Sequence, residues 1–177
     1  MLALILDTEC TGLIDNRIVK DERLPEVIEF YAELVNLDNG ALMSSLERLC
    51  KPTRAITQEI VDITGITNEM VADQPPFSLI APTLFTLIET SPRVIAHNMT
   101  YDKECLDIEA QRLNYQIKWP QLICSVEQTV HLTGRRLTLS ALYQHLFKEK
   151  FKDAHRAKND VKALTQCCVE LYRLGEL

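Results

Sequence analysis

The chain has 177 residues, a length that fits one domain with a full hydrophobic core. Hydrophobic residues make up 46% and charged residues 25% of the sequence, an ordinary globular composition, and no apolar run approaches the roughly 20 residues that a membrane span needs. The net charge of -6 argues against extensive nonspecific binding to duplex nucleic acid. It does not exclude a small site that binds the end of a nucleic-acid strand, because bound divalent cations would return positive charge locally.

The first predicted element is a buried strand, Leu4–Leu6, that runs into Asp7-Thr8-Glu9. Because side chains alternate along a strand, Asp7 and Glu9 project from the same face. Two adjacent carboxylates repel each other unless a proton or a cation lies between them, so the pair suggests a divalent metal with oxygen ligands, such as Mg²⁺ or Mn²⁺. The pattern D-x-E is common, and a solvated strand end remains an alternative reading at this point.

The next elements predict an antiparallel start to the sheet. A turn at 10–13 and a polar loop at 16–24 lead to a strand at 27–35. Asp38-Asn39-Gly40 is typical of a hairpin turn, and residues 41–50 form the returning strand.

Strands and helices alternate in the rest of the chain, which indicates parallel additions to the sheet. Thr57 and Gly65 are the expected cap and stop of a short helix. The expected helices are 56–63, 77–89, 102–114, 125–132, 138–147 and 153–174, and the expected strands are 93–96 and 122–124. The sequence therefore predicts an α/β fold in a single domain, 1–177, with a central mixed five-stranded sheet, an antiparallel start and helices on both faces.

The six cysteines, at positions 10, 50, 105, 124, 167 and 168, include no C-x-x-C pair and no spacing suited to zinc. The N-terminus lacks the pattern of a signal peptide. We therefore expect a reduced, cytoplasmic protein.

Two further acids lie where helices meet the sheet. Asp102 precedes Leu106 by four residues and so faces inward on its helix, where a carboxylate needs a partner. Asp160 falls near the edge of the apolar stripe of the last helix, Ala157, Val161, Leu164, Cys168 and Leu171. His155 can share a site with Asp160 only if it lies before that helix or in its first turn.

Taken together, these residues resemble the DEDDh exonucleases, the DnaQ-like family within the ribonuclease-H-like fold. Asp7-Thr8-Glu9 with Thr11-Gly12-Leu13 is similar to the first motif of that family. The second motif corresponds to residues 94–98 with Tyr101-Asp102, and the third to His155-Arg156-Ala157 with Asp160 and Ala163. Gly65-Ile66-Thr67 with Met70 is similar to a connecting segment in these enzymes. The motifs occur in the family's order across nearly the whole chain.

The resemblance implies a catalytic set of Asp7, Glu9, Asp102, Asp160 and His155. The four acids would hold two Mg²⁺ or Mn²⁺ ions, and His155 would act as general base toward the attacking water. The implied activity is 3′→5′ hydrolysis of terminal phosphodiesters in single-stranded nucleic acid, with DNA favoured, to give nucleoside 5′-monophosphates.

The resemblance also implies residues that contact the terminal nucleotide. They are Thr8, Cys10, Thr11, Gly12 and Leu13, with Leu13 against the base, and further candidates are Glu59, Thr64 and Asn98. The alternative role for Asn98 is to cap the following helix. The alternative for Glu59 is a solvent-exposed acid on a helix with no substrate contact. Thr64 stands where many proofreading members carry histidine, and Cys10 where threonine is usual.

The expected partners are 3′ ends of single-stranded DNA or RNA, with a polymerase or a replication or repair protein as a possible further partner, and no membrane. Basic residues that could follow a phosphate backbone cluster in the last third, at 135, 136, 148, 150, 152, 156 and 158. Two alternatives stay open: a proofreading subunit of a DNA polymerase, and a catalytically silent scaffold of the same fold.

Overall fold

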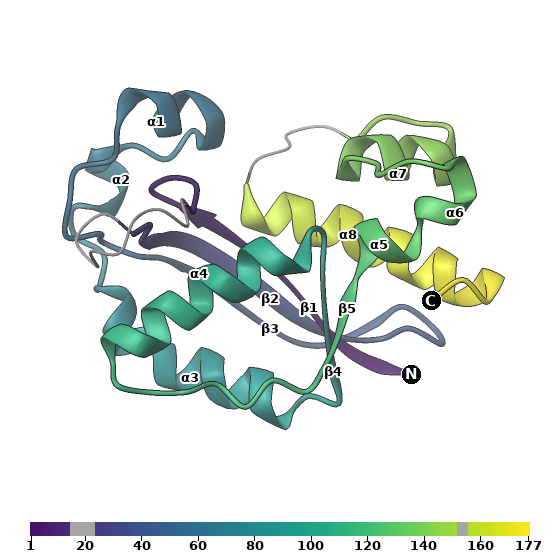
Figure 1. Ribbon diagram of the computed structural model, residues 1–177, viewed down its shortest axis with the longest axis horizontal. Helices are drawn as coiled ribbons and strands as arrows, with labels where there is room; N and C mark the ends of the chain where they lie inside the picture. The colour runs from purple at the N-terminus through teal and green to yellow at the C-terminus, as the bar shows by residue number, and fades with distance from the viewer. Residues whose placement is uncertain (15–23, 152–155) are drawn as a thin grey trace.

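The computed structural model describes residues 1–14, 24–151 and 156–177. Its centre is a five-stranded sheet in the order β3-β2-β1-β4-β5 (Figure 1). The strands are β1 (Leu2–Cys10), β2 (Val27–Asn36), β3 (Ala41–Leu49), β4 (Arg93–Ala96) and β5 (Gln121–Cys124). This architecture confirms the predicted mixed sheet.

The sheet has an antiparallel half and a parallel half that meet at β1. β2 pairs antiparallel with both β1 and β3, whereas β4 pairs parallel with β1 and with β5. The turn between β2 and β3 contains Gly40 at φ 70°, a backbone conformation that glycine adopts without a steric penalty. The predicted hairpin is therefore present.

The helices follow the predicted order, but several of their bounds differ, and the helix expected from residue 102 begins at Met99. They are α1 (Gln58–Thr64), α2 (Asn68–Val71), α3 (Phe77–Thr90), α4 (Met99–Arg112), α5 (Ser125–Gln128), α6 (Val130–Thr133), α7 (Leu139–Phe147) and α8 (Ala157–Leu174). The helix expected at 125–132 is divided at Thr129, whose φ and ψ of -104° and 2° depart from helical values. The short α2 was not predicted. The last helix was expected from 153, but Arg156 is extended, at φ -135°, and α8 begins at Ala157.

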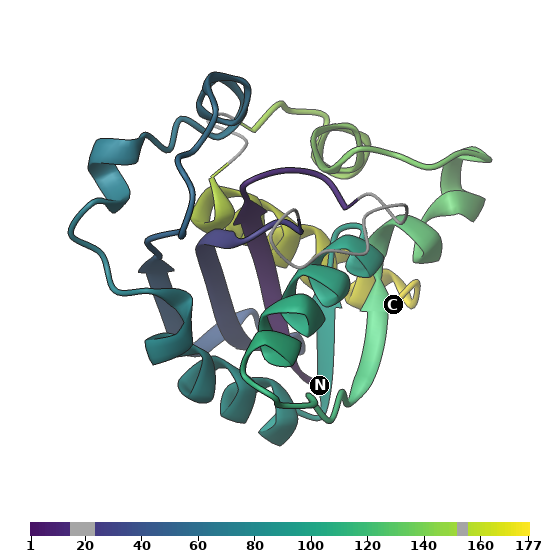
Figure 2. The same ribbon diagram turned by 60° about the vertical axis from the view of Figure 1, so that its left-hand side comes forward.

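The helices cover both faces of the sheet (Figures 1 and 2). Alternate residues of β1 belong to opposite layers. Leu4 and Leu6 pack in a cluster with residues of α3 and α4, whereas Ala3 and Ile5 pack with Val161 of α8. α7 packs on α8 through a separate apolar cluster. Odd-numbered residues of β1 therefore face α8, and even-numbered residues face α3 and α4.

All six cysteines are free thiols, and five of them are buried. Within the described ranges, no helix combines the length and apolar character that a membrane crossing requires.

Candidate metal centre and substrate pocket

Three carboxylates meet at the end of β1. Asp7 and Glu9 have the same parity as Ala3 and Ile5, so they face α8, and Asp160 lies in the first turn of that helix. One carboxylate oxygen from each residue lies within 4.8 Å of the other two. This spacing suits ligands of a shared divalent cation, and both the strand pair and the helix acid were predicted members of such a site.

Asp102 approaches the same strand end from the opposite layer. It lies in the first turn of α4 and is 2% exposed. Thr8, whose parity directs it toward α4, donates both its backbone N–H and its hydroxyl to Asp102 Oδ1, each at 2.9 Å. The predicted inward orientation of Asp102 is therefore observed, and its hydrogen-bonding partner is the residue between Asp7 and Glu9.

Burial and mutual repulsion oppose ionisation of these acids. Desolvation followed by the charge of Asp102 raises the pKa of Asp7 well above its usual value. Desolvation followed by the charge of Asp160 raises the pKa of Glu9 to about 8. Desolvation raises the pKa of Asp102 to about 7, although the two hydrogen bonds from Thr8 oppose the shift. A divalent cation would remove this penalty by supplying the missing positive charge.

A fifth acid, Glu29, lies beside the cluster and was not predicted. It is the Cα partner of Glu9 across the β1–β2 pair and is 2% exposed. Arg156 forms an ion pair with it, at 2.6 Å between Nη2 and Oε1. The sequence indicates only that Glu29 shares a face of its strand with alternate residues. It does not indicate the ion pair with Arg156, which lies 127 residues away in the sequence.

Three of the basic residues proposed to follow a phosphate backbone form ion pairs within the protein. Besides Arg156, Lys158 pairs with Glu47 at 2.6 Å and Arg136 with Glu127 at 2.8 Å. These contacts favour a structural role for Arg156 and Lys158.

A pocket of about 670 Å³ opens beside the acids. Asp7, Glu9, Asp102 and Asp160 line it, and the other described lining residues are Thr8, Leu13, His97, Asn98, Tyr101, Val126, Arg136, Leu137, Thr138, Leu139, Ser140 and Phe151. A cavity of this size suits one small ligand or one nucleotide.

Two residues at the end of β4 form part of the pocket wall. Asn98 adopts φ 72° and its side chain caps no helix N–H, although it accepts a hydrogen bond from Arg136 at 3.4 Å. His97 contacts the Ser125 hydroxyl through Nδ1 at 2.8 Å and donates from Nε2 to the Leu137 carbonyl oxygen at 3.1 Å. Desolvation lowers the pKa of His97 to about 4, so the ring is neutral near pH 7.

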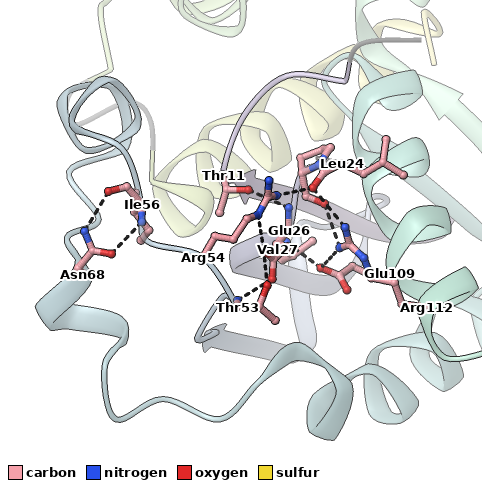
Figure 3. Close-up of polar contacts among 11 residues, drawn as sticks. Thr11, Leu24, Glu26, Val27, Thr53, Arg54, Ile56, Asn68, Glu109 and Arg112 are labelled. Carbon is pink, nitrogen blue, oxygen red and sulfur yellow. Dashed lines mark hydrogen bonds and ion pairs between the residues drawn. The ribbon is translucent and has the colours of Figure 1, made fainter. Parts of the chain in front are cut away.

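Hydrogen bonds to Glu26 hold the turn that follows β1 (Figure 3). Thr11 exchanges hydrogen bonds with Glu26, through its N–H to the Glu26 carbonyl oxygen and through its hydroxyl oxygen from the Glu26 N–H. Glu26 in turn accepts hydrogen bonds from Thr53 and Arg54. Tyr101, next to Asp102, donates to the Gly12 carbonyl oxygen at 2.9 Å. These contacts present Leu13, which is 84% exposed, at the pocket.

The other predicted substrate residues lie away from the pocket lining. Cys10 is buried, and Thr11 and Gly12 contribute the contacts just described. Glu59 is exposed on α1, and the Thr64 hydroxyl is bonded to the Ile60 carbonyl oxygen and the Ile66 N–H. His155, the predicted general base, lies outside the described residues.

The donor set fits Mg²⁺ or Mn²⁺ better than softer metals. The clustered ligand atoms are carboxylate oxygens, which hard cations prefer, and the three clustered residues include no cysteine or histidine. The cluster also combines like charges with partial burial, an arrangement that a cation stabilises.

The sheet and its flanking helices form a ribonuclease-H-like fold. The family model described as an exonuclease, RNase T, matches residues 4–167, so the chain belongs to this exonuclease family, whose DEDDh, DnaQ-like members share its motifs.

Individual relatives agree with this assignment. The chain is 31% identical over 149 residues to the DNA polymerase III subunit epsilon of Pasteurella multocida, an overlap that covers 81% of this chain and 56% of that subunit. The structure of exonuclease X in complex with 5′ overhanging duplex DNA has a TM-score of 0.73 and 22% identity, and covers 98% of this chain and 93% of that one. The nuclease domain of 3′hExo, a DEDDh member bound to rAMP, has a TM-score of 0.81 and 15% identity, with 98% and 92% coverage.

Proposed function

We propose that this protein is a metal-dependent 3′→5′ exonuclease that hydrolyses the terminal phosphodiester of single-stranded nucleic acid, with DNA favoured, to a nucleoside 5′-monophosphate. The observation that carries the proposal is the convergence of Asp7, Glu9 and Asp160 within 4.8 Å, beside a pocket that Asp102 also lines. The family assignment supports hydrolysis of nucleic acid from an end.

The four acids would hold two divalent cations, which would activate water and neutralise charge at the scissile phosphate. Thr8 fixes the orientation of Asp102 through its two hydrogen bonds. His155, one residue before Arg156, would accept the proton of the attacking water.

The pocket would hold the terminal nucleotide. Leu13 presents an exposed apolar side chain that can pack against a base, and the contacts of Thr11 and Gly12 hold it in place. Asn98 lies at the pocket wall within reach of a sugar or phosphate. Cys10, Glu59 and Thr64 do not line the pocket, so we propose no substrate contact for them.

The test is a nuclease assay of purified protein on a single-stranded oligonucleotide labelled at its 5′ end, with Mg²⁺ or with chelator. A ladder of products shortened from the 3′ end is expected, with nucleoside 5′-monophosphate released. Chelator and Asp7→Ala should each abolish it. Activity that survives either treatment would contradict the mechanism, and parallel rates on RNA and on duplex ends would define the substrate.

A second candidate role is a proofreading subunit of a DNA polymerase, favoured by the similarity to a polymerase III subunit epsilon. Mismatched and matched primer ends distinguish the two roles, assayed with and without a polymerase catalytic subunit. Full activity of the isolated protein would argue against dependence on a partner. A silent scaffold would show no cleavage under any of these conditions.

A further inference from the structure

Glu29 faces the same helix as the metal-site acids. Residues of β2 alternate like those of β1, and Glu29 lies directly opposite Glu9 in the antiparallel pair. Side chains of such cross-strand partners project from the same face of a sheet. Glu29 therefore lies beside Glu9 on the face of the sheet that α8 covers.

Among the described residues, the hydrogen bonds to the Glu29 side chain all come from Arg156 and Ala157, at the start of that helix. Arg156 Nε donates to both carboxylate oxygens at 3.2 and 3.1 Å, and Arg156 Nη2 donates to Oε1 at 2.6 Å. The backbone N–H of Ala157 donates to Oε2 at 3.0 Å. Both oxygens are thus engaged by protein donors, which favours a positioning role over metal ligation.

The contact with Ala157 caps the beginning of α8. The first N–H groups of a helix have no partner within the helix, and the side chain of Arg156, the N-cap residue, accepts no capping hydrogen bond. Glu29 supplies the acceptor from the neighbouring strand, with a negative charge that suits the positive end of the helix dipole.

Asp160 is held by the same helical turn. Its backbone N–H donates to the Arg156 carbonyl oxygen at 3.0 Å. The path from Glu29 to Asp160 therefore passes through Arg156 by an ion pair on one side and a backbone hydrogen bond on the other. Arg156 and Asp160 therefore belong to one hydrogen-bonded helical turn.

We propose that Glu29 is a positioning residue that fixes Asp160 in the metal site by holding the start of α8 through Arg156 and Ala157. The inference rests on the proposed function, because it assumes that the clustered acids bind divalent cations. Partners that orient metal ligands typically change affinity by about 10- to 100-fold when removed.

The experiment measures Mn²⁺ binding by isothermal titration calorimetry, at fixed pH and ionic strength, with no substrate present. We expect Glu29→Gln to weaken binding about tenfold. The matched control is Glu47→Gln, which removes a second ion pair between the sheet and the start of α8, from Lys158 at 2.6 Å. That pair is more than 40% exposed on both sides, and its loss should change Mn²⁺ affinity less than twofold.

A second variant separates positioning from simple charge effects. Arg156→Met removes a positive charge near the acids, so charge alone would strengthen Mn²⁺ binding, whereas loss of positioning weakens it. We expect Glu29→Gln and Arg156→Met each to weaken Mn²⁺ binding. The double variant should bind Mn²⁺ no more weakly than the single variant with the lower affinity. Because the Arg156 side chain is 38% exposed, its variant also serves if Glu29→Gln fails to fold.

Stronger binding by Arg156→Met, or an unchanged affinity in folded Glu29→Gln, would overturn the positioning role. In that case wild-type protein would still bind Mn²⁺, and the proposed nuclease function would stand. Absence of Mn²⁺ binding by the wild type would instead overturn the function itself. With activity as a second readout, Glu29→Gln should need more Mn²⁺ for half-maximal rate and recover most of kcat at saturation.

Discussion

Thr8 donates two hydrogen bonds to one oxygen of Asp102, from its backbone N–H and from its hydroxyl, both at 2.9 Å. Thr8, which lies between Asp7 and Glu9 in the sequence, thus orients Asp102, which reaches the site from the opposite face of the sheet. This arrangement follows from strand alternation, because odd-numbered residues of β1 face α8 and even-numbered ones face α4.

Thr8→Val tests the contribution of the hydroxyl. The substitution keeps the side-chain shape and the backbone N–H but removes one donor to Asp102, and a hydrogen bond to a charged group contributes about 1.5–3 kcal/mol. We expect exonuclease activity to fall at least tenfold and the pKa of Asp102 to rise further above about 7. Thr8→Ser, which keeps the hydroxyl, should retain most of the activity.

Asp7→Asn should inactivate the enzyme and stabilise the metal-free protein. The amide removes a ligand, which should reduce the rate by about 100- to 1000-fold or more. It also removes the burial cost and the like-charge repulsion that together raise the pKa of Asp7. Relief of about 1 kcal/mol would raise Tm by about 2–4 °C in chelator. The exposed Asp73→Asn is the control, and a Tm of Asp7→Asn below that of the wild type would contradict the repulsion argument.

Stability of the metal-free protein should fall as pH rises from 6.5 to 8. The pKa of Glu9 is about 8 in the folded state against 4.5 in the unfolded chain, so the folded state binds more protons in this range and loses stability as they dissociate. His97 has a folded pKa of about 4 against 6.5 in the unfolded chain, so it contributes the opposite trend, a gain of about 0.4 kcal/mol between pH 6.5 and 8, which is smaller than the loss expected from Glu9.

The expected loss is roughly 1–2 kcal/mol over this interval, measured by urea unfolding in chelator. Saturating Mg²⁺ should remove the decline, because the cation binds the ionised carboxylates and stabilises the folded state more at higher pH. Glu9→Gln in chelator should also show a flatter profile. An equal decline with and without Mg²⁺ would show that other groups cause it.

Leu13→Ala tests the contact proposed for the terminal base. Leu13 is 84% exposed at the pocket, so its truncation should leave Tm unchanged while KM for a single-stranded oligonucleotide rises about 3- to 10-fold, the loss of a partly buried apolar contact. Leu79→Ala is a matched control, since Leu79 is 73% exposed on α3 and does not line the pocket. Equal KM values for both variants would remove Leu13 from substrate binding.

Local patterns predicted the fold well. The hairpin at Asp38-Asn39-Gly40, the parallel strand at 93–96 and the buried stripe of α8 all follow from turn chemistry and periodicity. The break at Thr129 was missed because helical periodicity continues through it, and the extended Arg156 was missed because its conformation depends on a partner in β2.

The candidate site was partly accessible from the sequence. Strand parity placed Asp7 and Glu9 together, and helical spacing turned Asp102 inward. The sequence did not show that Thr8 meets Asp102, because that contact requires knowing which helix covers which face of the sheet. Arg156 was counted among the basic residues that could follow a phosphate backbone or form a solvated face. The sequence did not show its ion pair with Glu29, because the two residues lie 127 positions apart.

The separation of Asp7 and Asp160 along the chain also has a consequence for biosynthesis. Asp7 lies in the first strand and Asp160 in the last helix. During synthesis, Asp7 and Glu9 therefore leave the ribosome long before Asp160. The cluster is complete only when α8 packs on β1. A polypeptide that ends before α8 therefore lacks one of the three clustered carboxylates and could not form the proposed cation site.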